Sequence, residues 1–240
     1  MIMDFTLDKY AALLDALEGS EAELRHDVDR APERSAEMAR LEAAKGWRAT
    51  YYFRAVPCSW DESVIREIAS LGHEIGYHYE CLTTTRGDFP AAWEDFKLNF
   101  NRLKEIYPSL CKIVMHGSPR SPFDSRDLWK HYDYREVGAT HEPYLDTDFT
   151  STFYLTDTGR RWDGFNVSVR DKIPQMQDEW TRRGLVFHST DEIIRAARSG
   201  VLPSKVLITT HPQRWMPFGW GWIKEFLLQN VKNCVKKLKK

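Results

Sequence analysis

The chain has 240 residues, of which 42% are hydrophobic and 13% aromatic, enough to bury the core of one enzyme-sized domain without disulfides. Its 34 lysines and arginines nearly balance 35 aspartates and glutamates, so no overall charge favours binding to nucleic acid. The four cysteines show no CxxC spacing and neither an apolar leader nor a membrane-length apolar run is present, so we expect one cytoplasmic domain over residues 1–240.

The first apolar run ends in Arg25-His26-Asp27-Val28-Asp29, the most informative segment of the chain. Alternation along a strand places Asp27 and Asp29 on the same side. Two carboxylates aimed together can divide the work of a hydrolytic site, because one can hold a metal while the other accepts a proton. The structural alternative is a solvated strand end, in which Asp29 caps the helix that Pro32 opens.

Strand and helix patterns alternate from this segment to residue 116, which is typical of a parallel sheet or barrel. In chain order, the later segments are a helix over 32–45, a strand over 49–53, a helix over 61–72, a strand over 72–80, a helix over 90–106 and a strand over 113–116. The pattern is weaker afterwards: a loop over 118–124, short strands over 149–156 and 165–169, a helix over 191–197 and a strand over 206–210.

Polar residues stand at the ends of three of these later strands. His78 and Glu80 share one face of their strand, His116 ends the next strand, and His211 ends the last one. In proteins with parallel strands, ligands gather at the carboxyl ends of the strands. We therefore expect these residues to converge with the two aspartates.

The order of these motifs resembles that of a known superfamily. A His-Asp-Val-Asp segment, a Gly-His-Glu-Ile-Gly-Tyr-His segment, a proline- and arginine-containing loop and a final His-Pro resemble the polysaccharide deacetylases, also called the NodB-homology or family 4 carbohydrate esterases. The resemblance covers roughly residues 22–215. It implies an α/β fold with a distorted, incomplete (β/α) barrel of the polysaccharide deacetylase type. It also implies a zinc or other divalent metal that helps to hydrolyse the N-acetyl group of an amino sugar, by analogy in surface-polysaccharide precursor biosynthesis.

Carried over by position, the resemblance gives roles to individual residues. It implies that Asp27 is the catalytic base and His211 the general acid, and that Arg120 orients the base. It further implies that Asp29 is the first metal ligand and His78 the second.

The chain departs from the family pattern at Leu82, where a second metal-binding histidine is normally found four residues after the first. A catalytic zinc site takes three protein ligands and keeps one position open for water. Either His116 or Glu80 could complete the set, and we favour His116, because a neutral imidazole preserves the usual charge balance. Because this histidine is missing, a second function stays open, that of a metal-free hydrolase of cyclic amides or ureides.

Other residues have less specific interpretations. Trp162 and Trp215 are candidate substrate-binding residues that would stack on a sugar, with ordinary packing as the alternative. A carboxylate such as Asp157 or Asp163 is expected to raise the pKa of the general acid. Two further function classes stay open: a glycosyltransferase with a metal–nucleotide motif, which leaves the histidines without a role, and a catalytically silent sugar-binding domain.

The C-terminal segment, residues 220–240, has six lysines, one glutamate and apolar residues at helical spacing. This pattern predicts a basic amphipathic helix. Such a helix either docks on the barrel and leaves a solvated lysine tail, which we favour, or lies on an anionic membrane surface as a peripheral contact at the inner membrane face.

Overall fold

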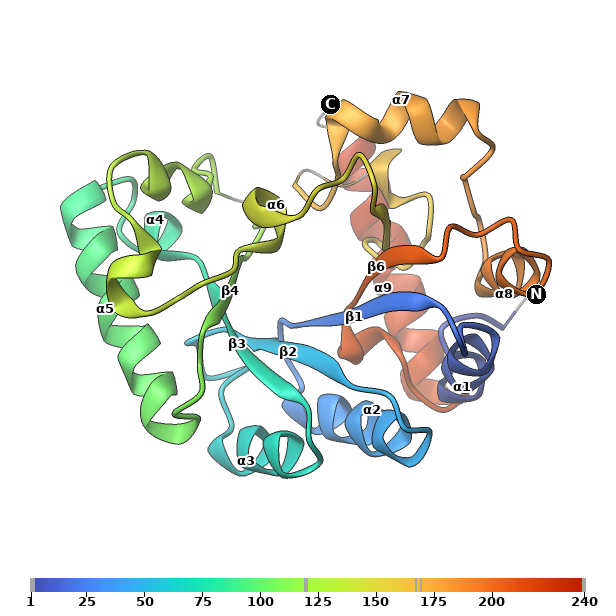
Figure 1. Ribbon diagram of the computed structural model, residues 1–240, viewed down its shortest axis with the longest axis horizontal. Helices are drawn as coiled ribbons and strands as arrows, with labels where there is room; N and C mark the ends of the chain where they lie inside the picture. Colours follow the sequence, from blue (N-terminus) through green and yellow to red (C-terminus); the bar gives the residue numbers. More distant parts are fainter. Residues whose placement is uncertain (1–2, 119–120, 167, 169, 239–240) are drawn as a thin grey trace.

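The computed structural model describes residues 3–118, 121–166, 168 and 170–238. Its centre is one curled sheet that forms a half-barrel (Figure 1). The strands are β1 (Glu21–Val28), β2 (Ala49–Phe53), β3 (Glu74–Tyr79), β4 (Lys112–Met115), β5 (Phe153–Thr156) and β6 (Lys205–Thr210). They lie in the order β4-β3-β2-β1-β6-β5, and each pair is parallel. The carboxyl ends of all these strands therefore meet at one edge, as the sequence predicts.

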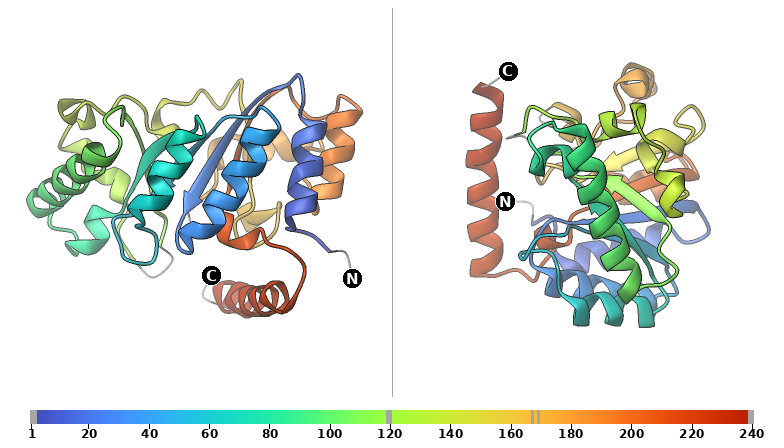
Figure 2. Two further views of the ribbon diagram at one scale, coloured as in Figure 1. Left: turned by 90° about the horizontal axis from the view of Figure 1, so that it is seen from below. Right: turned by 90° about the vertical axis from the view of Figure 1, so that its left-hand side faces the viewer.

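Helices line the outer side of the sheet, where α5, α3, α2, α1 and α8 stand in a row (Figure 2, left). The α-helices are α1 (Leu7–Ala16), α2 (Pro32–Ala44), α3 (Glu62–Ser70), α4 (Cys81–Thr84), α5 (Phe89–Ile106), α6 (Pro143–Asp146), α7 (Pro174–Arg182), α8 (Thr190–Arg198) and α9 (Trp220–Leu238). Short 3₁₀ helices are η1 (Ser125–Lys130), η2 (Tyr134–Val137), η3 (Gly164–Asn166) and η4 (Pro212–Arg214). None of the described helices is long and apolar enough to cross a membrane.

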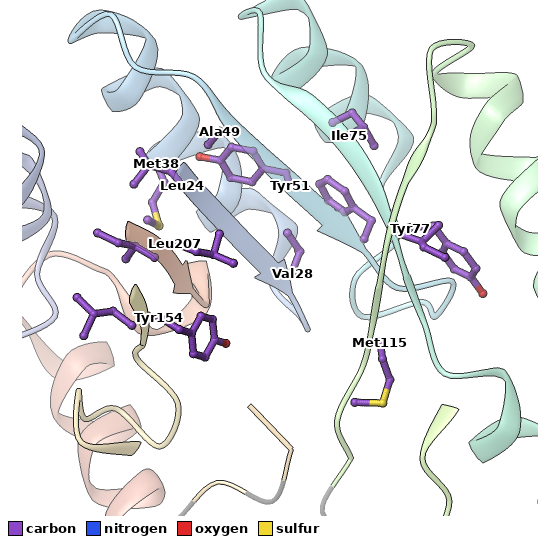
Figure 3. Packing of buried hydrophobic residues seen from close by; sticks show 14 of the residues in the cluster. Leu24, Val28, Met38, Ala49, Tyr51, Ile75, Tyr77, Met115, Tyr154 and Leu207 are labelled. Atoms are coloured by element: carbon purple, nitrogen blue, oxygen red, sulfur yellow. The ribbon is translucent and has the colours of Figure 1, made fainter. Parts of the chain in front are cut away.

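Alternation along β1 divides its side chains between the two faces of the sheet. Leu24 and Val28 pack in the hydrophobic core beside Tyr51 of β2 (Figure 3). His26 shares their face and lies 2.8 Å from Glu42 of α2, where both side chains are fully buried. Asp27 consequently faces the opposite, inner side of the half-barrel.

Local sequence signals account for the ends of several helices. The side chain of Asp61 caps α3 by accepting from the amides of Ser63 and Val64, and Ser189 caps α8. The residue before α2 is Ala31, in the left-handed conformation and without a side-chain cap. Asp29 is therefore not the cap of α2, and the structural alternative for this carboxylate is wrong.

The outer edge of β4 is covered by the segment that leads into α6. The amide of Ile113 donates to the carbonyl of His141 at 2.9 Å. The amide of Met115 donates to the carboxylate of Glu142 at 3.1 Å. Both outward-facing amides of this edge strand are thus satisfied by the same short segment.

Some predicted elements differ from the structure. The predicted strand over 165–169 is wrong at its start, because Gly164–Asn166 form η3, while residues 167 and 169 lie outside the described residues. β5 begins at Phe153 rather than at residue 149, since Asp148 accepts from Thr150 and Ser151 and holds a turn there. Helices α1 and α7 were not expected from the sequence.

Candidate metal centre

A carboxylate and two imidazoles meet at the carboxyl edge of the sheet. Asp29 directly follows β1, His78 lies on β3, and His116 directly follows β4. Asp29 Oδ1 is 3.6 Å from His78 Nε2 and 3.4 Å from His116 Nε2. One ligand atom from each residue lies within 4.8 Å of the other two. These residues form a candidate metal-binding triad, which we call the triad below.

The hydrogen bonds of the imidazoles fix which ring nitrogen faces Asp29. His78 Nδ1 lies 3.0 Å from the carbonyl oxygen of Val114, which can only accept, so Nδ1 carries a hydrogen. His116 Nδ1 lies 3.0 Å from the carboxylate of Glu80 and is a donor for the same reason. The neutral form of each ring therefore directs the lone pair of Nε2 toward the carboxylate, as in zinc-bound histidines.

A positive charge between these side chains would complete their bonding. Among the described residues, Asp29 Oδ1 has no hydrogen-bond partner although it is buried. Protonating both imidazoles would place two cations on rings whose centroids are 5.1 Å apart. One divalent cation satisfies the carboxylate and both lone pairs at once.

The spacing of the triad also fits tetrahedral coordination of one metal ion. With zinc–oxygen and zinc–nitrogen bonds of about 2.0–2.1 Å, tetrahedral angles place two ligand atoms about 3.3 Å apart. The separations of 3.4 and 3.6 Å from Asp29 Oδ1 are close to this value. The nitrogen and carboxylate donors are those that zinc accepts.

Glu80 lies behind His116 rather than beside Asp29. Its carboxylate accepts from Arg54 Nη2 at 2.7 and 2.9 Å and from His116 Nδ1 at 3.0 Å. Burial favours the neutral acid, but the hydrogen bond from His116 and the charge of Arg54 lower the pKa of Glu80. The structure thus places His116, not Glu80, with the other two ligand atoms, and Glu80 orients the imidazole.

Asp27 is held on the inner face of the sheet by an arginine from its own strand. Arg25 donates to both carboxylate oxygens at 3.1 Å, and both side chains are buried. Burial opposes ionisation, yet Arg25 lowers the pKa of Asp27. Asp27 Oδ2 lies 4.0 Å from His78 Nε2, so a charged carboxylate stands beside the triad. Arg120, expected to orient this base, lies outside the described residues.

His211 approaches the triad from the end of β6. Its Nε2 is 3.9 Å from Asp29 Oδ2, while its Nδ1 is 2.6 Å from Asp157 Oδ1. Asp157 is fully buried and also pairs with Arg214 at 2.6 Å. Burial and Arg214 disfavour a protonated His211, but Asp157 outweighs them and raises the pKa of His211.

Three other residues predicted for the site have other contacts, although Trp215 supports it indirectly by donating its indole N–H to Asp157 Oδ2 at 2.8 Å. Asp163 pairs with Arg161 and His188, away from His211. Trp215 is fully buried, and Trp162 is only 3% exposed and donates to Thr190. Both indoles pack with Phe5 in the core, so in this structure neither offers a face to a sugar, and the packing alternative holds.

Sequence reasoning missed several side chains that shape the site. Arg25 and Arg54 each clamp one carboxylate, and Gln213 donates to Asp29 Oδ2 at 3.2 Å. Alternation along β1 places Arg25 on the face of Asp27, which was a usable signal. Arg54 follows β2 in a connecting segment and Gln213 lies in the short helix η4, where spacing carries no such information.

The sequence matches no protein-family model and no curated protein.

Proposed function

We propose that this protein is a metal-dependent hydrolase that removes an N-acetyl or similar acyl group from an amino sugar. The observation that carries the proposal is the buried Oδ1 of Asp29, which faces the Nε2 atoms of His78 and His116 and has no hydrogen-bond partner among the described residues. The amino-sugar substrate and a role in surface-polysaccharide precursor biosynthesis come from the motif resemblance.

The surrounding side chains suit hydrolysis of a linear amide. A divalent ion, with zinc the best match to these ligands, would supply an acidified water and polarise the amide oxygen. Asp27, kept ionised by Arg25, would accept a proton from the attacking water. His211, whose pKa is raised by Asp157, would donate a proton to the amine nitrogen as the carbon–nitrogen bond breaks. The products are a carboxylic acid and a free amine.

The experiment measures bound metal and acid release from a panel of N-acylated amino sugars. Wild type is expected to contain stoichiometric metal and to lose activity in chelator. Asp29→Ala is expected to lose its metal. Asp27→Asn is expected to keep its metal and lose roughly two to four orders of magnitude in turnover. Asp127→Asn, at an exposed surface carboxylate, is the matched control.

Three results would contradict the proposal, and a fourth would change its mechanism. Activity that survives in chelator would favour a metal-free hydrolase of cyclic amides. Binding of nucleotide sugars, measured by calorimetry, would favour a glycosyltransferase. A metal-loaded protein without turnover on any substrate would indicate a silent sugar-binding domain. Normal turnover of Asp27→Asn would remove that carboxylate from the mechanism.

A further inference from the structure

The C-terminal helix α9 packs on the protein through its polar residues. Glu225, Gln229 and Asn233 recur on one face of the helix and are buried, together with Trp222. Glu225 forms an ion pair with Arg30 at 2.7 Å. Asn233 donates to the carbonyl of Gly159 at 2.7 Å, and the Trp222 indole donates to the carbonyl of Asp4 at 2.8 Å. Trp222 is the apolar residue that this anchoring buries, while several other apolar side chains of the helix stay exposed.

Those apolar residues point away from the protein. Figure 2 (right) shows α9 as a separate rod along the outside of the molecule. Its exposed apolar side chains are Trp220 (87% exposed), Val231 (63%), Leu227 (58%) and Leu228 (45%). Residues 220, 227 and 231 recur at the spacing of one helical face, so they form one stripe, which we call the outer face of α9. Large exposed apolar side chains that share one helical face mark an interaction surface.

The charges on this segment are almost all positive. Lys224 and Lys232 are exposed on the helix beside the outer face, and the sequence ends with four further lysines among residues 236–240. The single acidic residue of 220–240 is Glu225, which faces the protein and is paired with Arg30. The outer face therefore combines apolar side chains with Lys224 and Lys232, which pair with no acidic side chain among the described residues.

We propose that the outer face of α9 docks on an anionic membrane surface. Apolar side chains enter the boundary between headgroups and acyl chains, while lysines bind lipid phosphates, and tryptophan favours this interface. A second copy of the chain fits less well, because it would bring two rows of lysines together. The proposal does not depend on the proposed chemistry.

The position of α9 also relates the surface to the metal centre. Arg30, which pairs with the helix, directly follows Asp29, and Gly159 lies two residues after Asp157. Docking through α9 would therefore hold the carboxyl edge of the sheet close to the lipid surface.

The test uses the full chain with vesicles of phosphatidylcholine alone or mixed with phosphatidylglycerol. Wild type is expected to sediment with the mixed vesicles and to be released by salt. The double variant Leu227→Gln, Val231→Gln and the charge reversal Lys224→Glu, Lys232→Glu are each expected to weaken binding by about tenfold or more. Leu98→Gln, at an exposed leucine of α5, and Lys130→Glu, at an exposed lysine of η1, are matched controls that should bind normally.

Three outcomes would overturn the proposal. The first is wild-type protein that ignores anionic vesicles, and the second is equal binding to phosphatidylcholine alone. The third is a concentration-dependent dimer in sedimentation velocity that is lost in the Leu227→Gln, Val231→Gln variant, which would identify a second copy as the partner. An unchanged thermal midpoint and metal content of each variant exclude misfolding as the cause of lost binding.

Discussion

His116 and Glu80 illustrate how position decides the role of a side chain at the metal centre. His116 offers Nε2 to the space beside Asp29, whereas Glu80 holds the opposite nitrogen of the same ring. Removing a ligand costs more affinity than removing the group that orients it.

We expect His116→Ala to lower zinc affinity by well over about tenfold, since one of three protein ligands is gone. Glu80→Gln should lose less, because the amide oxygen still accepts from His116 Nδ1. Competition with a chromophoric chelator measures both affinities, and His188→Ala, at an exposed histidine, is the control. A larger loss for Glu80→Gln than for His116→Ala would make Glu80 the ligand.

Glu142 gives a pH-dependent prediction because it is fully buried. Burial raises the pKa of Glu142 from its ordinary 4.5 to about 7, despite hydrogen bonds from the amides of Met115 and Tyr144. A pKa that is higher in the folded chain means that the protonated form favours folding. This contribution is complete below about pH 4.5 and is lost as pH rises through about 7.

The free energy of unfolding of wild type relative to Glu142→Gln should therefore fall by about 3 kcal/mol across this pH range. Glutamine does not titrate, so the difference between the two proteins isolates this carboxyl from all others. Chemical denaturation at pH values on either side of the range measures it. A difference that stays constant with pH would show that Glu142 titrates normally.

At the scale of single residues, the sequence predicted the members of the candidate triad better than the side chains that support them. Alternation along the strand predicted the side of the sheet that Asp27 faces. The position of His116 at the end of a strand predicted that it lies at the carboxyl edge of the sheet. The sequence favoured His116 over Glu80 only on charge balance, because both lie at strand ends and both can ligate a metal; the geometry places His116 with Asp29 and His78. Arg54 reaches Glu80 through a tertiary contact that no local spacing encodes.

At the scale of elements, Gly76 of β3 leaves room for the ring of its register partner Tyr52 on the paired strand β2. A Cβ on Gly76 would lie 2.3 Å from the ring of Tyr52, which is buried. We expect Gly76→Ala to destabilise the protein by about 1–3 kcal/mol through overpacking. Urea denaturation measures this change.

Two further variants test the explanation. Gly76→Ala should lower the free energy of unfolding less in a Tyr52→Leu protein than in wild type, since the clashing ring is gone. Gly219→Ala, where no atom lies within 4 Å of the added Cβ, is the control for the residue type. Equal losses at the two glycines would mean that the contact with Tyr52 is unimportant.

The elements that were predicted well carry signals within their own residues. The buried run of β2 and the Asp61 cap of α3 are examples of such local signals. The segment after β4 was predicted poorly because tertiary contacts decide it: Arg170, for example, donates to the carbonyls of Ser118 and Phe123, far away in the sequence.

At the scale of the whole molecule, the candidate metal centre brings together residues from three strand ends. Asp29, His78 and His116 come from β1, β3 and β4, so an ion bound there opposes separation of these strands. Zinc at a thousandfold excess over its Kd should stabilise the fold by about 4 kcal/mol and raise the thermal midpoint by roughly ten degrees. Scanning calorimetry with zinc and then with chelator measures the shift. Asp29→Ala should show no shift, and an equal shift in that variant would place the stabilising ion elsewhere.

The segment with His141 and Glu142 that covers the outer edge of β4 affects how chains behave at high concentration. An open parallel sheet ends in a strand whose free amides can recruit a strand from a neighbouring molecule, which is the first step of ordered aggregation. Here the carbonyl of His141 and the carboxylate of Glu142 already occupy the outward amides of Ile113 and Met115. The half-barrel can therefore keep one side open without offering β4 as a template for strand-to-strand polymerisation.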